Sequence, residues 1–206
     1  VDSLFDHARA ANAANLQQAR RYVRRLDADG GTEMRPALLT ALSQAEPSDL
    51  LRQVVFLTDG AVGNERALFA LIQQRLGNSR LFTVGIGSAP NAYFMRRAAR
   101  FGRGSFTFIG SPAEVETQIG ALFDQLDQPV LTDLSVTWDL PNGVQFVESA
   151  EKRMPDLYAG QPLVVAIAAD QMPRAAMVEG RIAGQSWSHL ARLSGGADAP
   201  GVHALW

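Results

Sequence analysis

Two short polar segments carry the residue types best suited to binding a metal ion. One runs from Asp29 to Met34 between two helix-like stretches, and the other, Thr58-Asp59-Gly60, follows a buried strand-like run. Mg²⁺ prefers oxygen ligands in octahedral geometry and retains several of its waters. These segments therefore predict Thr32 as a direct ligand and Asp59 as a ligand that binds directly or through water.

Each segment also has a simpler structural interpretation. Thr32 is a good N-cap for a helix that begins near Met34. Asp59 and Gly60 suit a turn in which Asp59 caps a helix that starts near Asn64. Taken singly, these structural interpretations are favoured. The order and spacing of the two segments together favour a metal site.

The first ~127 residues alternate between helical and strand-like patterns, so we expect this stretch to form the first domain. Apolar residues at helical spacing predict helices over about 12–27, 36–45, 68–76, 91–101 and 112–126. Short continuous apolar runs, typical of parallel strands buried on both faces, cover 54–58, 81–86 and 105–109. This alternation predicts an α/β fold with a Rossmann-like parallel sheet and flanking helices. Asp59 then lies at the carboxyl end of a strand, where open α/β sheets bind their ligands.

The pattern changes at Gln128 and Pro129. Apolar and polar residues alternate over 134–140, as in a half-buried strand, and another strand is expected over 163–169. Two further apolar runs flank Ala183-Gly184 and predict a hairpin. We therefore predict an α/β domain over residues 1–128 and a smaller antiparallel β domain over residues 129–206.

Composition argues against several kinds of function. The formal net charge is −2 and the pI is about 5.9, so nucleic acid finds no overall basic surface. The one basic cluster, formed by Arg20, Arg21, Arg24 and Arg25, is expected to be a solvated helix face. The chain has no cysteine, which removes disulfides, thiolate zinc sites and cysteine nucleophiles.

Signals of catalysis are weak throughout the sequence. The three histidines are scattered, and neither a P-loop nor a nucleophile elbow is present. The segment Asp133 to Thr137 reads as Asp-x-Ser-x-Thr, but its polar residues alternate with apolar ones along a predicted strand and do not curl around an ion. We predict a non-enzymatic protein with no catalytic residue and no bound organic cofactor.

The order of these motifs resembles a von Willebrand factor A domain. Gly30-Gly31-Thr32 comes first, followed by a buried strand that ends in Thr58-Asp59-Gly60 and then by Phe82 to Gly87. The closer similarity is to the A domains of inter-alpha-trypsin inhibitor heavy chains and their bacterial relatives. That similarity rests on Asn15-Leu16, residues 30–38, residues 129–138, residues 157–162 and the terminal Ala204-Leu205-Trp206.

In that family three loops build a metal-ion-dependent adhesion site, and the first loop, Asp-x-Ser-x-Ser, has no counterpart here. The resemblance implies an N-terminally truncated domain in which Val1 to Phe5 form the short third strand. It implies a partial site made by Thr32 and Asp59, with Mg²⁺ bound in the full-length parent and not in this fragment. The strand at 54–58 would then have an open apolar edge, which predicts self-association or a rearranged sheet.

The resemblance implies an adhesion or protein-binding module of a secreted or envelope-anchored bacterial protein. An acidic residue of the protein ligand would complete the metal coordination. Membrane contact would come only through an anchor outside this segment. The alternative is a structural scaffold module of an envelope protein without metal function, in which Thr32 and Asp59 only cap helices.

Overall fold

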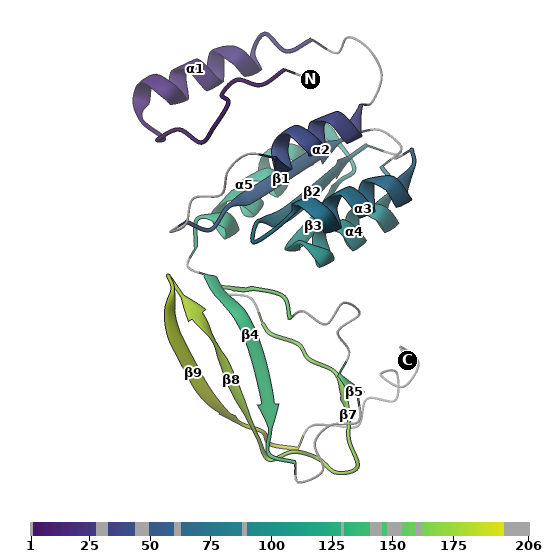
Figure 1. Cartoon of the computed structure of the whole chain (residues 1–206), viewed down its shortest axis with the longest axis vertical. Coiled ribbons are helices and arrows are strands. Elements are labelled where there is room, and N and C mark those ends of the chain that lie inside the picture. Colours follow the sequence, from purple (N-terminus) through teal and green to yellow (C-terminus); the bar gives the residue numbers. More distant parts are fainter. Residues whose placement is uncertain are drawn as a thin grey trace. The chain divides into compact units, whose positions relative to one another are not determined.

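The chain forms two compact units, Val1–Leu126 and Asp127–Trp206, each with its own sheet. Figure 1 shows helices and parallel strands in the first unit and strands in the described part of the second. The structure is a computed structural model, and it describes residues 2–27, 33–43, 50–59, 63–87, 90–128, 130–140, 146–147, 154–159 and 162–195.

The first unit alternates helices and strands, as the apolar spacing predicts. Its strands form a parallel sheet in the order β1-β2-β3, which confirms the predicted α/β fold. The elements are α1 (Ala13–Val23), α2 (Met34–Leu42), β1 (Gln53–Thr58), α3 (Glu65–Arg75), β2 (Arg80–Ile86), α4 (Ala92–Phe101), β3 (Arg103–Ile109), the 3₁₀ helix η1 (Pro112–Glu114) and α5 (Val115–Leu126).

The core of this unit is formed by α2, α3 and α4 together with the sheet. Its buried members are Met34, Leu38, Leu42, Leu68, Phe69, Leu71, Ile72, Leu76, Leu81, Phe94, Met95 and Ala98. The rings of Phe69 and Phe101 meet edge to face, with centroids 5.5 Å apart. The buried Thr83 hydroxyl of β2 donates to the Met95 carbonyl at 3.0 Å, which holds α4 against the sheet.

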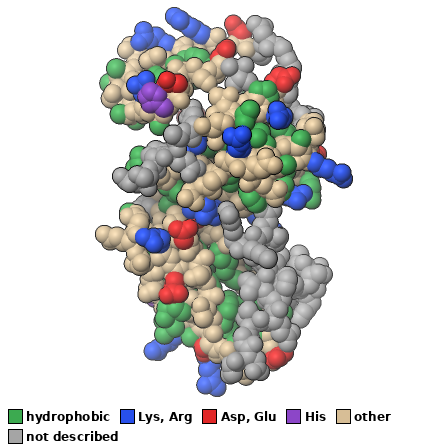
Figure 2. Space-filling view, viewed as in Figure 1, with side chains coloured by type: hydrophobic (Ala, Val, Ile, Leu, Met, Phe, Trp, Pro, Cys, Tyr) green, Lys and Arg blue, Asp and Glu red, His purple; other side chains and the backbone are tan. Residues whose placement is uncertain are grey.

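Helix α1 differs from the other α-helices of this unit because it has no buried residue. It ends at Val23, four residues earlier than the pattern predicts. Its apolar stripe is largely exposed, and all four arginines of the cluster over 20–25 are exposed, which confirms a solvated basic face. Figure 2 shows basic side chains gathered over this helix.

The predicted strand at Val1 to Phe5 is wrong for the described residues 2–5, which adopt no strand conformation. A strand requires a neighbouring strand to take up its backbone hydrogen bonds. Here the segment lies along α1, where the Tyr22 hydroxyl donates to the Asp2 carbonyl at 3.1 Å.

Residues 111–114, directly before α5, form only part of a capping box. The Ser111 side chain makes no capping hydrogen bond to the helix. It donates to the Glu114 carboxylate at 3.2 Å, and that carboxylate accepts the backbone N–H of Gly110 at 3.0 Å. The glutamate therefore reaches one residue further back than a capping box requires, because the first turn is a tighter 3₁₀ turn.

The second unit contains an antiparallel four-stranded sheet in the order β6-β4-β8-β9. Its hairpin turns at Ala183 and Gly184, whose φ values of 48° and 79° suit the turn that matches strand twist. The strand predicted over 163–169 is much shorter. The strands are β4 (Val130–Trp138), β5 (Phe146–Val147), β6 (Leu157–Tyr158), β7 (Ile167–Ala168), β8 (Ala175–Ile182) and β9 (Gln185–Arg192).

Candidate functional site

The carboxyl ends of the three parallel strands define one edge of the first sheet. Strand β1 ends at Thr58, which is in register with Gly85 of β2. Asp59 is the first residue beyond β1 and is exposed, so its carboxylate lies at this edge as predicted. Within the described part of the chain, no hydrogen bond or ion pair engages that carboxylate. It remains available for a ligand.

The other predicted ligand, Thr32, lies outside the described residues. The structure describes the helix that follows Thr32 in the chain. Helix α2 begins at Met34, which is buried, and packs against α3. Helix α2 is therefore held in the core from its first residue.

The capping interpretation of Asp59 is wrong. The residue at the N-cap of α3 is Asn64, five positions further along the chain. Asn64 adopts a left-handed conformation with φ 52°, and its side chain makes no capping hydrogen bond. Likewise, the residue at the N-cap of α2 is Glu33. The position of Asp59 is thus not explained by a capping role.

Two glycines shape the neighbouring loop after β2. A Cβ at Gly85 would lie 2.9 Å from the Pro90 side chain, so glycine leaves room for Pro90 against the strand. Gly87 has φ +81°, a conformation that favours glycine at the end of the strand. Its backbone N–H donates to the Ile109 carbonyl at 2.8 Å and ties this turn to β3.

Sequence reasoning missed two polar residues at the same edge. Asn91 caps α4, and its side-chain amide also donates to the Glu65 carboxylate at the start of α3. An asparagine before a helical pattern is a recognisable cap. Its hydrogen bond to Glu65 joins residues 26 positions apart, and no local sequence pattern predicts such a partner.

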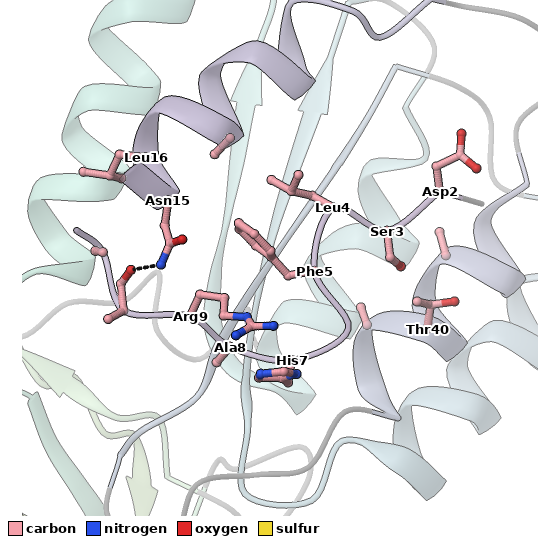
Figure 3. A pocket seen from close by; sticks show the side chains of 15 residues that line it. Asp2, Ser3, Leu4, Phe5, His7, Ala8, Arg9, Asn15, Leu16 and Thr40 are labelled. Atoms are coloured by element: carbon pink, nitrogen blue, oxygen red, sulfur yellow. Dashed lines mark hydrogen bonds between the residues drawn. The ribbon is translucent and has the colours of Figure 1, made fainter. Parts of the chain in front are cut away.

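A hollow with a described lining lies elsewhere, beside α1 and α2 (Figure 3). It has a volume of about 600 Å³, and Leu4, Phe5 and Leu16 contribute to its lining. Asp59 is not among its described lining residues. The carboxylate of Asp59 therefore belongs to the sheet edge and not to this hollow.

The chemistry at the edge fits one ligand of a magnesium site. An exposed carboxylate is a hard oxygen donor of the kind that Mg²⁺ prefers. Among the described residues, no group of three His, Asp or Glu side chains is placed to hold an ion. Asp133 sits in a bulge of β4 with φ 54°, while Ser135 and Thr137 are exposed further along the strand, so this segment does not curl around a cation.

Comparison with known proteins adds independent evidence on the family. A family model of the von Willebrand factor type A domain matches residues 1–108. A von Willebrand factor A domain-containing protein of Dictyostelium discoideum is 29% identical over 163 residues, which are 78% of this chain and 19% of that protein. The von Willebrand factor A domain-containing protein 5A of Rattus norvegicus is 30% identical over 153 residues, 73% of this chain and 18% of that protein.

A solved structure shows the same fold. The von Willebrand factor type A protein from Catenulispora acidiphila superposes with a TM-score of 0.61 over 88% of this chain and 51% of its own, at 19% identity. The chain spans less than a fifth of the length of each of the two curated relatives, from Dictyostelium discoideum and Rattus norvegicus. With the family model matching over half of the sequence, the chain belongs to the von Willebrand factor type A domain family.

Proposed function

We propose that this chain is part of a non-enzymatic protein-binding module in which Asp59 and Thr32 contribute to a magnesium site. Domains of this family are generally protein-interaction modules. The observation that carries the proposal is the Asp59 carboxylate. It is exposed at the carboxyl edge of a parallel sheet and takes no part in capping α3.

The proposed site needs ligands beyond those that the described residues supply. Asp59 offers one carboxylate to a cation that requires about six oxygen ligands, several of them waters. Thr32 would offer a hydroxyl from the segment that precedes α2. When bound, Mg²⁺ would supply a concentrated positive charge that attracts a carboxylate. The role of this chain is to hold the Asp59 carboxylate at the end of a rigid strand.

The chemistry of such a site favours a protein ligand that presents an acidic residue. A carboxylate on the partner would complete the coordination and give a charge contact shielded from water. Adhesion is the corresponding biological role. We also propose that the A domain is of the kind found in inter-alpha-trypsin inhibitor heavy chains. A secreted or envelope-anchored location of the parent protein is part of the same proposal. None of the described helices has the length and apolar character needed to cross a membrane.

Replacing Asp59 should weaken Mg²⁺ or Mn²⁺ binding by at least about tenfold, because a direct or water-mediated carboxylate ligand is lost. The measurement is calorimetric titration of both cations into the longest natural protein that contains this chain, with and without Asp59→Ala. Asp124→Ala removes another exposed carboxylate, on α5, and should leave the affinity unchanged.

Two results would contradict the proposal in different ways. Equal loss of affinity in the Asp59→Ala and Asp124→Ala proteins would indicate nonspecific electrostatics. Absence of binding in the unmodified natural protein would leave the structural scaffold as the function. The scaffold draws support from the lack of three clustered carboxylate or imidazole groups among the described residues.

A second part of the proposal concerns self-association through β1. Within the described residues β1 pairs only with β2, and Leu57 of this edge strand is 51% exposed. An apolar strand at the edge of a sheet favours pairing with another chain. We expect the 206-residue chain to show concentration-dependent association in sedimentation velocity.

Leu57→Lys should shift that association toward monomer, because a charge on an edge strand opposes strand pairing. Val164→Lys is a matched control, since Val164 is 83% exposed and lies in the second unit. A monomer at all concentrations in the unmodified chain, or equal effects of both substitutions, would argue against the edge as the interface.

A further inference from the structure

One side-chain hydrogen bond joins the two helices that start at the carboxyl edge of the first sheet. The Asn91 amide donates from Nδ2 to Oε1 of Glu65. Its Oδ1 accepts the backbone N–H of Phe94 at 3.0 Å, which is the capping bond of α4. Both ends of the amide are therefore engaged, and only one orientation of the side chain satisfies both bonds.

This bond spans two connections that are distant in sequence. Helix α3 follows β1 and helix α4 follows β2, and these two strands are parallel neighbours up to Thr58 and Gly85. Glu65 is the first residue of α3, and Asn91 lies directly before α4. Joining them fixes the start of one helix to the start of the next.

The chemistry makes this a strong hydrogen bond. Glu65 and Asn91 are both partly buried, which limits competition from water. The acceptor is a carboxylate in the first turn of a helix, where the helix dipole favours negative charge. Hydrogen bonds with an ionised partner are roughly twice as strong as neutral ones.

We propose that Glu65 and Asn91 form a positioning pair that sets the placement of Asp59. Asp59 and Glu65 bound the β1–α3 connection on its two sides. Anchoring Glu65 to the β2–α4 connection restricts how far Asp59 can move from the strand end. The pair acts through Asp59 and not as a ligand itself. This inference rests on the proposed metal-binding function, but the coupling between the two connections can be measured without metal.

Three variants separate the pair from the helix cap. Asn91→Asp keeps a good capping acceptor for the Phe94 N–H but removes the donor to Glu65. Glu65→Ala removes the acceptor. The double variant Glu65→Gln with Asn91→Asp restores a hydrogen bond of reversed polarity, because the amide then lies at position 65 and the carboxylate at position 91.

The first measurement is hydrogen–deuterium exchange on the 206-residue chain without metal. Both single variants should raise the exchange rate of peptides covering 58–68 by about tenfold, the effect of losing one charge-assisted hydrogen bond. The double variant should return the rate toward that of the unmodified chain. Unchanged exchange in the two single variants would overturn the proposal.

The second measurement is Mn²⁺ affinity in the longest natural protein that contains this chain. Asn91→Asp should weaken Mn²⁺ binding about tenfold, within the range expected for partners of metal ligands, and the double variant should recover most of it. Faster exchange with unchanged affinity would refute a positioning role. If the unmodified protein binds no Mn²⁺, the metal-binding proposal fails, whereas the exchange data still decide whether the two connections are coupled.

Discussion

Gly104→Ala should destabilise the first unit by about 3 kcal/mol, the upper part of the range for overpacking in a core. A Cβ at this position would lie 2.3 Å from the Leu81 carbonyl oxygen and 2.8 Å from the Leu81 carbonyl carbon. Both atoms belong to the backbone of the central strand β2, so no side-chain rotation relieves the contact. The strands β2 and β3 must separate locally, next to Phe82, which is fully buried.

The measurement is urea unfolding followed by far-UV circular dichroism. The α-helices of the described residues all lie in the first unit, so the helical signal reports on that unit. Gly120→Ala is the matched control, because Gly120 lies within α5 with open space around its Cβ position. That substitution should stabilise the unit by roughly 0.5–1 kcal/mol. A destabilisation shared by both variants would contradict the close approach at Gly104.

Leu38→Ala should cost the first unit about 2–5 kcal/mol, the range for a buried leucine in a packed core. Leu38 is 1% exposed and is the central member of the buried row formed by Met34, Leu38 and Leu42 of α2. The helix has nine residues and no side-chain cap, so packing against α3 supplies most of its stability. The free energy of unfolding from urea titration measures this loss.

Val23→Ala is the control for this substitution. Val23 is the last residue of α1 and is 62% exposed, so its replacement should change the free energy of unfolding by less than about 0.5 kcal/mol. The Leu38→Ala protein should also show faster hydrogen exchange in α2. If the Leu38→Ala and Val23→Ala proteins had comparable free energies of unfolding, burial of Leu38 would not be what holds α2 in the core.

The strands of the first unit were predictable because buried parallel strands consist of continuous apolar runs. The run at 54–58 became β1 with one additional residue, and the run at 81–86 became β2 in the same way. The helices that pack on the sheet were predictable from apolar spacing for a similar reason. The hairpin around Ala183 and Gly184 was predictable because two apolar runs flank a glycine, which tolerates the positive φ of such a turn.

Helix α1 marks the limit of this kind of prediction. Its apolar stripe has helical spacing, yet none of its residues is buried. Spacing indicates which face of a helix is apolar, but it carries no information on what covers that face. The segment 2–5 fails for a related reason, because a strand depends on a partner that the local sequence does not specify.

The sequence by itself determined the order of helices and strands, the parallel sheet and the location of Asp59 at a strand end. These follow from local patterns of apolar residues. Only the tertiary structure decided that Asn64 and not Asp59 occupies the N-cap of α3, and that Asn91 bonds to Glu65. Both depend on where separate segments meet in space, and residues 26 positions apart acquire that proximity only when β1 and β2 pair.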